Sequence, residues 1–157
     1  MRKGQIRAIS ICVFRIDDTI LVCEGFDQIK QDYYYRPIGG GIEYGETSSA
    51  ALEREVLEEI GANIINIKHL GTIENIFTYN GDLGHEIVFV YDAEFVDKSF
   101  YEKSTFIGME DNGESIKLSW KPLNSFADNK LSELKNRHPF PTRLFIYQVM
   151  SSFESLM

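Results

Sequence analysis

The chain has 157 residues, of which 43% are apolar and 25% charged, and its formal net charge at pH 7 is -8. This length favours a single domain, residues 1–157, with a substantial core, and the apolar content excludes an intrinsically disordered chain. The acidic balance argues against nucleic-acid binding as the main purpose, because phosphate backbones attract Lys and Arg. It does not exclude small phosphorylated substrates.

Targeting signals and cysteines bear on the compartment. No apolar core of signal-peptide length follows the basic residues near Met1, and the longest apolar runs have the length of strands, so we expect no membrane span. Two cysteines without an export signal favour reduced thiols in a cytoplasmic protein. Cys12 and Cys23 lie equally far from the turn at residues 17–18, so a tight hairpin there would place them opposite each other. The three histidines lack zinc-ligand spacing.

The first third of the chain predicts strands followed by a glycine turn. Residues 5–16 and 19–26 predict two strands around a short polar turn, and residues 33–36 predict a third strand that ends at Pro37. Residues 39–41 are all glycine and predict a turn whose backbone can approach a metal or a phosphate closely. A helix of about four turns should follow, with Thr47 or Ser48 as N-cap and Gly61 at its C-terminal end.

Long strands dominate the remainder. Residues 64–79 and 84–96 predict two strands joined by the sequence Asn-Gly-Asp at residues 80–82, which is typical of a hairpin. Residues 98–113 should be irregular, and such long connections are often functional. A strand over residues 115–120, ended by Pro122, and helices over 129–135 and 142–153 complete the prediction.

The predicted helix carries clustered acids. Residues three and four apart are neighbours on a helix, so Glu55, Glu58 and Glu59 share one face, beside an apolar stripe. A solvated surface would explain an isolated pair of glutamates, but clustered carboxylates repel one another unless a cation neutralises them. Because carboxylate oxygens suit hard cations, the spacing predicts a Mg²⁺ or Mn²⁺ site.

The glycine turn and the helix also fit one longer pattern. Gly40 is followed after five residues by Glu46, and after seven more by the run REVLEEIGA at residues 54–62. This spacing resembles the Nudix box, the signature of the Nudix hydrolases. Two positions depart from that pattern: Ala62 stands where a larger apolar residue is usual, and Pro37 lies one place earlier than the family's proline.

The resemblance implies an α/β (α+β) fold, the α/β/α sandwich with a mixed β-sheet. It implies hydrolysis of a phosphoanhydride bond in a nucleoside diphosphate linked to another group. Nucleoside triphosphates, dinucleoside polyphosphates and nucleotide sugars such as ADP-ribose all remain open as substrates. The implied cofactor is Mg²⁺ or Mn²⁺, the implied partner is a small-molecule nucleotide, and a homodimer is compatible with the family.

The resemblance also assigns roles residue by residue. Glu55, Glu58 and Glu59 match the family's metal ligands, together with the backbone carbonyl of Gly39. Arg54 matches the arginine that orients a catalytic glutamate. Glu46, the remaining matched acid, corresponds to the glutamate that braces the loop against the helix.

The general base has two solutions within the family. One is a glutamate of the box, here Glu55. The other is a glutamate from a later loop, for which Glu110 and Glu114 are the residues in the irregular segment, with Glu86 a weaker alternative. A plain loop position is the competing interpretation for each of the later residues.

Substrate contacts are predicted from residue type. Arg36 precedes the glycine turn and could meet a phosphate or form a surface ion pair. Tyr79 lies 17 residues beyond the box, where dinucleoside polyphosphate hydrolases of this family tend to carry tyrosine. Several aromatic residues could stack on a base or belong to the core: Tyr33, Tyr35, Phe77, Tyr79 and Trp120.

Two other functions compete with the hydrolase. A non-catalytic, nucleotide-binding regulatory module would be favoured by a missing box glutamate, and none is missing. An RNA 5′-end pyrophosphohydrolase would need a basic groove, which the acidic composition does not indicate.

Overall fold

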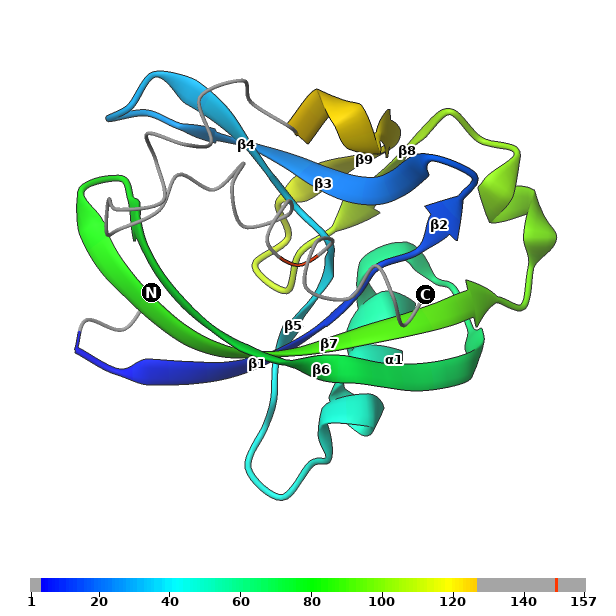
Figure 1. Cartoon of the computed structure of the whole chain (residues 1–157), viewed down its shortest axis with the longest axis horizontal. Helices are drawn as coiled ribbons and strands as arrows, with labels where there is room; N and C mark the ends of the chain where they lie inside the picture. The colour runs from blue at the N-terminus through cyan, green and yellow to red at the C-terminus, as the bar shows by residue number, and fades with distance from the viewer. Residues whose placement is uncertain (1–3, 127–148, 150–157) are drawn as a thin grey trace.

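The computed structural model describes residues 4–126 and Val149, and their strands form two sheets (Figure 1). One sheet has the strand order β5-β1-β7-β6, and the other has the order β2-β3-β9-β8, with β4 also paired to β3. The strands are β1 (Ile6–Cys12), β2 (Arg15–Ile16), β3 (Thr19–Asp27), β4 (Asp32–Arg36), β5 (Ile38–Gly41), β6 (Ile64–Tyr79), β7 (Asp82–Phe95), β8 (Thr105–Met109) and β9 (Ser115–Pro122). The helical elements are α1 (Ser48–Ile60) and the short 3₁₀ turns η1 (Lys98–Tyr101) and η2 (Leu123–Phe126).

The first sheet is mixed. β1 runs parallel to β7, whereas β5 pairs with β1 and β6 pairs with β7 in antiparallel fashion. The predicted α/β fold with a mixed sheet is therefore confirmed. Apart from Val149, the helices predicted over 129–135 and 142–153 lie outside the described residues, and the single domain over 1–157 stays a prediction.

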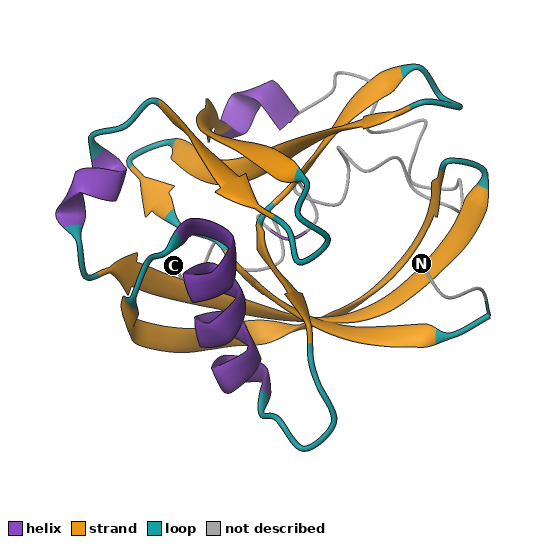
Figure 2. Ribbon diagram, turned by 180° about the vertical axis from the view of Figure 1, so that it is seen from behind, coloured by secondary structure: helices purple, strands orange, loops and turns teal. Residues whose placement is uncertain are grey.

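Helix α1 has the predicted bounds. The Thr47 side chain accepts a hydrogen bond from the N–H of Ala50, and Gly61 ends the helix in a left-handed conformation at φ 68°. The helix contacts β5 and β1 of the first sheet and β8 of the second. Figure 2 shows it lying across the strands of the first sheet. Leu52 and Val56 are fully buried on this side. Burying this flank fixes the rotation of the helix and hence the direction of its acids.

The core has two parts. Apolar side chains of β1, β3 and β7 pack between the sheets, among them Ile11, Val22 and Val90, and a second cluster surrounds α1. In the part of the chain that the structure describes, no helix is long and apolar enough to cross a membrane.

Two segments predicted as irregular are strands. The prediction of a glycine turn at residues 39–41 is wrong, because β5 pairs with β1 there, with Ile11 opposite Gly39. The irregular segment at 98–113 is also wrong, since it contains η1 and β8, and β8 pairs with β9. Glycine lowers strand propensity in both stretches, and pairing with a partner strand overrides it.

The predicted placement of the cysteines is wrong as well. Strands β1 and β2 are separate and belong to different sheets, so Cys12 pairs with Ile38 and Tyr91 in the first sheet. Cys23 pairs with Arg36 and Leu118 in the second sheet. Both thiols are buried and free.

Two hairpins from different sheets meet at their tips. The Asp27 carboxylate, at the end of β3, accepts hydrogen bonds from the backbone N–H groups of Ile29, Lys30 and Asn80 at 2.9 to 3.1 Å. The side-chain oxygen of Asn80 in turn accepts from the N–H of Gln28 at 3.0 Å. The N–H of Lys30, the largest influence, and the other donors lower the pKa of Asp27. Asp27 therefore ties the β3–β4 hairpin to the β6–β7 hairpin.

Candidate metal and active site

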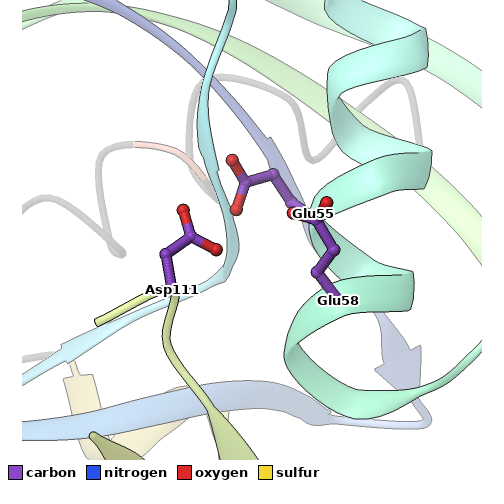
Figure 3. Close-up of side chains that lie close together, drawn as sticks. All are labelled: Glu55, Glu58 and Asp111. Carbon is purple, nitrogen blue, oxygen red and sulfur yellow. The ribbon is translucent and has the colours of Figure 1, made fainter. Parts of the chain in front are cut away.

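Carboxylates from two distant stretches converge beside α1 (Figure 3). Glu55 and Glu58 come from the helix, and Asp111 comes from the loop between β8 and β9. One oxygen of each lies within 4.8 Å of the others. Glu55 is buried, and the other two are exposed. Sequence reasoning missed Asp111, because its only signal is a position in the Asp-Asn-Gly sequence of a connecting loop.

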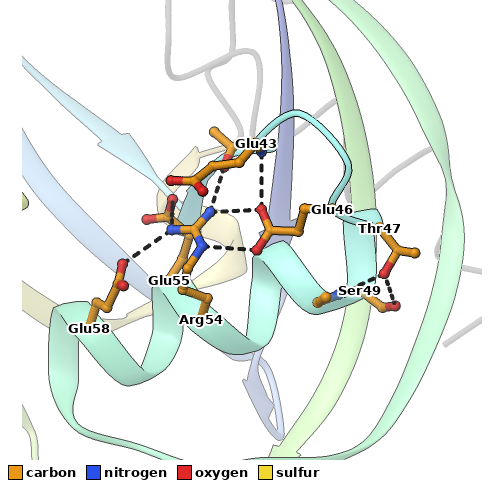
Figure 4. Close-up of polar contacts among 9 residues, drawn as sticks. Glu43, Glu46, Thr47, Ser49, Arg54, Glu55 and Glu58 are labelled. Carbon is orange, nitrogen blue, oxygen red and sulfur yellow. Dashed lines mark hydrogen bonds and ion pairs between the residues drawn. The ribbon is translucent and has the colours of Figure 1, made fainter.

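Arg54 organises the predicted box residues (Figure 4). Its guanidinium donates to both oxygens of Glu46, at 2.9 and 3.0 Å, and to one oxygen of Glu55 at 2.9 Å. It also donates to Glu58 at 3.1 Å and to the carbonyl oxygen of Gly41 at 2.9 Å. Such a fork fixes several acceptors at once. Arg54 thereby joins the strand end, the loop and two acids of the cluster.

The same contacts set the charge of these acids. Hydrogen bonds from Arg54, and from the N–H of Glu43, lower the pKa of Glu46. Burial raises the pKa of Glu55, and Arg54 opposes that rise. Arg54 thus favours the charged form of Glu46, whereas burial disfavours the charged form of Glu55, a cost that a further positive charge would offset.

Glu59 lies apart from the three-acid cluster. It is 4% exposed, and its Oε2 atom has no hydrogen-bond partner among the described residues. Burial raises its pKa to about 7, Arg36 opposes the rise, and Glu110 and Glu55 add to it. The predicted set of three glutamates is therefore divided: two join Asp111, and the third faces Arg36, whose Nη2 atom lies 3.6 Å from Glu59 Oε1.

The glycines of β5 make room for these contacts. Gly39 has φ 133°, and a Cβ there would lie 2.1 Å from the carbonyl oxygen of Ser10. A Cβ on Gly40 would lie 2.5 Å from the carboxylate of Glu55. The carbonyl of Gly39, a predicted metal ligand, accepts a hydrogen bond from Arg36 Nη1 at 3.0 Å.

Glu55, Glu59 and Asp111 line a cavity of about 380 Å³. Arg36 lies in its wall and pairs with Glu110, so both predicted residues are brought to the site. Tyr79 also lines it, beside Tyr34 and Phe77. A cavity of this volume lies within the range of small-molecule sites.

Two predicted residues are not brought to the cavity. Glu114 is exposed and its backbone carbonyl closes a turn with Glu110, without lining the cavity. Trp120 packs on Tyr101, and its indole N–H donates to the carbonyl of Phe100 at 3.3 Å. It belongs to the cluster around α1 rather than to the cavity wall.

The residues present fit a hard divalent cation. The donor set of Glu55, Glu58 and Asp111 consists of carboxylate oxygens, which Mg²⁺ and Mn²⁺ prefer. Glu59, which lines the same cavity as Glu55 and Asp111, adds a buried Oε2 atom with no hydrogen-bond partner among the described residues. A cation would offset both the mutual repulsion of the acids and the desolvation of Glu55.

Comparisons with known proteins bear on the family and the fold of the chain. The model of the NUDIX domain family matches residues 4–143. No curated protein matches the chain in sequence.

Solved structures with the same fold have low sequence identity to the chain. An ADP compounds hydrolase is 18% identical with a TM-score of 0.53, and the match covers 100% of this chain and 78% of that one. A MutT structure, from work on Aliivibrio salmonicida and Vibrio cholerae, is 16% identical with a TM-score of 0.54, covering 95% and 100%. A NUDIX hydrolase from Nitrosomonas europaea is 18% identical with a TM-score of 0.54, covering 92% and 90%. At these identities the likeness concerns the fold.

Proposed function

The chain belongs to the NUDIX domain family, and from that premise we propose that it hydrolyses a phosphoanhydride bond in a small nucleotide-type substrate with the help of Mg²⁺ or Mn²⁺. The observation that carries the proposal is the convergence of Glu55, Glu58 and Asp111, two of which line a cavity, with Arg54 donating to the two glutamates. Catalysis of this kind needs positioned acids and charge neutralisation more than covalent chemistry by the protein.

The acids have separate tasks in this proposal. Glu55, Glu58 and Asp111 hold the cation, which when bound neutralises phosphate charge and acidifies water. Glu55 also accepts the proton of the attacking water, because Arg54 fixes its Oε1 atom and its side chain lines the cavity. Glu46 keeps Arg54 in place and has no contact with the reacting atoms.

Arg36 is a positioning residue in this proposal rather than a free phosphate ligand. Its guanidinium contacts Glu110, Glu59 and the carbonyl of Gly39. These contacts fix the wall of the cavity between β4 and the loop before β9. Glu110, which pairs with Arg36, is the second group that can take a proton.

The substrate class rests on cavity size, aromatic lining and charge. Tyr34, Phe77 and Tyr79 supply flat apolar faces in a cavity of about 380 Å³, which suit a base. The net charge of -8 speaks against a long polyanion as partner. Cytoplasmic location and a homodimer stay predictions from the sequence.

The test is release of phosphate or pyrophosphate across a panel of nucleoside triphosphates, dinucleoside polyphosphates and nucleotide sugars, with Mg²⁺ and with Mn²⁺. Wild type is compared with Glu58→Gln and with Glu53→Gln, an exposed acid of the same helix that is outside the cluster. We expect one compound class to be turned over by wild type and Glu53→Gln, and at least about 100-fold more slowly by Glu58→Gln.

Two results would contradict the proposal. Equal rates in all three proteins would remove the cluster from catalysis. Tight binding of a nucleotide without turnover by wild type, with either metal, would favour the non-catalytic binding module instead.

A further inference from the structure

A row of three polar side chains crosses the cavity wall, away from the cluster of acids. Arg7 of β1 pairs in register with Glu86 of β7, and Glu86 pairs with Asn75 of β6. All three line the cavity. Because residues two apart on a strand share a face, the next positions on the same face are apolar, including Ile9 and Val88. The polar row therefore interrupts an otherwise apolar wall.

The two inner members of the row are nearly inaccessible. Glu86 and Asn75 are each 8% exposed. Arg7 Nη1 lies 3.7 Å from Glu86 Oε1, which is an ion pair beyond hydrogen-bond length. The Asn75 amide also donates to Glu86. Burial raises the pKa of Glu86, and Arg7 and Asn75 both oppose that rise. The proposed catalysis uses none of these groups.

Glu86 and Asn75 both carry hydrogen-bond acceptors. A carboxylate can accept about four hydrogen bonds, and an amide oxygen about two. Glu86 accepts a hydrogen bond from the Asn75 amide and lies 3.7 Å from the Arg7 guanidinium. Because Glu86 and Asn75 pair in register and both line the cavity, a carboxylate and an amide carbonyl place acceptor oxygens side by side in its wall.

The row lies far enough from the acids to hold the other end of a nucleotide. Ile11 pairs with Gly39 next to the site, and Arg7 is four residues earlier on the same strand. At about 3.3 Å per residue, the separation along β1 is about 13 Å. A nucleotide places its base and its phosphate chain at opposite ends, which suits this separation.

Aromatic rings flank the row. Phe77 lies where a side chain of Gly84 would be, since a Cβ there would come within 2.4 Å of the ring, and Tyr34 lies in the same way over Gly25. Tyr79 packs against Tyr34 with ring centroids 5.3 Å apart. Rings held by packing against backbone offer fixed faces for stacking.

We propose that Glu86 and Asn75 read the base of the substrate, and that they select a base with two adjacent N–H donors, as in the N1–H and N2–H₂ edge of guanine. Two neighbouring acceptors match two neighbouring donors. Hypoxanthine lacks the amino group, and adenine presents an acceptor at N1 beside its amino group, so each leaves one buried oxygen unpaired. This inference rests on the proposed function only for the nature of the ligand.

Binding of non-hydrolysable α,β-methylene triphosphates separates the two proposals, because it needs no turnover. Calorimetric titration with Mg²⁺ compares the guanosine, inosine and adenosine compounds. We expect the guanosine compound to bind wild type at least about 10-fold more tightly than either of the others. The ratio should fall to near one in Glu86→Gln, whose amide replaces an acceptor with a donor.

Two further variants guard the interpretation. Glu74→Gln changes an exposed acid next to Asn75 on the opposite face of β6, and it should keep the wild-type ratio. Asn75→Ala removes the neighbouring acceptor and should also lower the ratio of the affinities. It provides a second test if thermal melting shows that Glu86→Gln does not fold stably.

The outcomes distinguish the proposals. Equal affinities of wild type for the three compounds would overturn the inference, as would an unchanged ratio in both cavity variants. If wild type prefers the guanosine compound, loses this preference in Glu86→Gln, and turns over no nucleotide, base recognition by Glu86 would be supported and the proposed hydrolase activity would be overturned.

Discussion

Replacing Arg54 by lysine keeps the charge but removes the fork. The guanidinium makes five hydrogen bonds, of which two go to Glu46 and one each to Glu55, Glu58 and the carbonyl of Gly41. A lysine ammonium at one point can retain about two of them. Hydrogen bonds to charged groups contribute about 1.5 to 3 kcal/mol each.

The side chain of Arg54 is 23% exposed, so water replaces part of what is lost. We therefore expect Arg54→Lys to lower the free energy of unfolding by about 2 to 4 kcal/mol, which for a protein of this size lowers the melting temperature by about 5 to 12 °C. Loss of the restraint on Glu55 should lower kcat/KM by roughly 100-fold.

Circular dichroism melts and phosphate release on the best substrate of the panel measure both effects. Arg15→Lys is the matched control, because Arg15 lies on the short strand β2 and outside the cluster. Melting within about 1 °C of wild type and unchanged kcat/KM in Arg54→Lys would refute the reasoning from the network.

Three further predictions follow from the site and the hairpin contact. Saturating Mn²⁺, at about 100 times its dissociation constant, should stabilise wild type by about 2.7 kcal/mol. Thermal melts with and without the metal should show that Asp111→Asn loses most of this stabilisation and that Glu114→Gln loses none. Equal stabilisation of both variants would exclude Asp111 as a ligand. Gly40→Ala should push the Glu55 carboxylate aside and lower kcat at least about 10-fold in the release assay, while a wild-type kcat would show that the close approach is dispensable. Asp27 has a folded-state pKa below its ordinary value of 3.8, so the stability that its carboxylate contributes is present above that pH and is lost as the pH falls through the lowered value. Urea denaturation should show that Asp27→Asn is less stable than wild type at pH 7 and that the difference vanishes in acid. A difference that is constant with pH would contradict this expectation.

Local sequence determined the helix and its acids because the signals are local. The cap at Thr47, the stop at Gly61 and the spacing from Arg54 to Glu59 all act within a few turns. The Asn-Gly step at residues 80–81 likewise predicts its hairpin, and both residues have positive φ.

Features that depend on distant parts of the chain could not be predicted in this way. Asp111 reaches Glu55 only because β8 packs against α1, a contact between residues about 50 apart in sequence. The strand at Gly39 exists because β1 pairs with it, against the low strand propensity of glycine. Glu114 and Trp120 carry suitable side chains, but neither lines the cavity, because Glu114 lies in the turn before β9 and Trp120 packs on Tyr101.

The parallel pairing of β1 with β7 has a consequence for synthesis of the protein on the ribosome. β5 and α1 emerge soon after β1 and can pair with it early, whereas β7 follows about 79 residues later in the register Ile6 to His85. Asp111 emerges later still. A nascent chain therefore carries the glutamates of the helix long before it can complete the acid cluster, so translation must pass the loop after β8 before the site can bind metal as a unit.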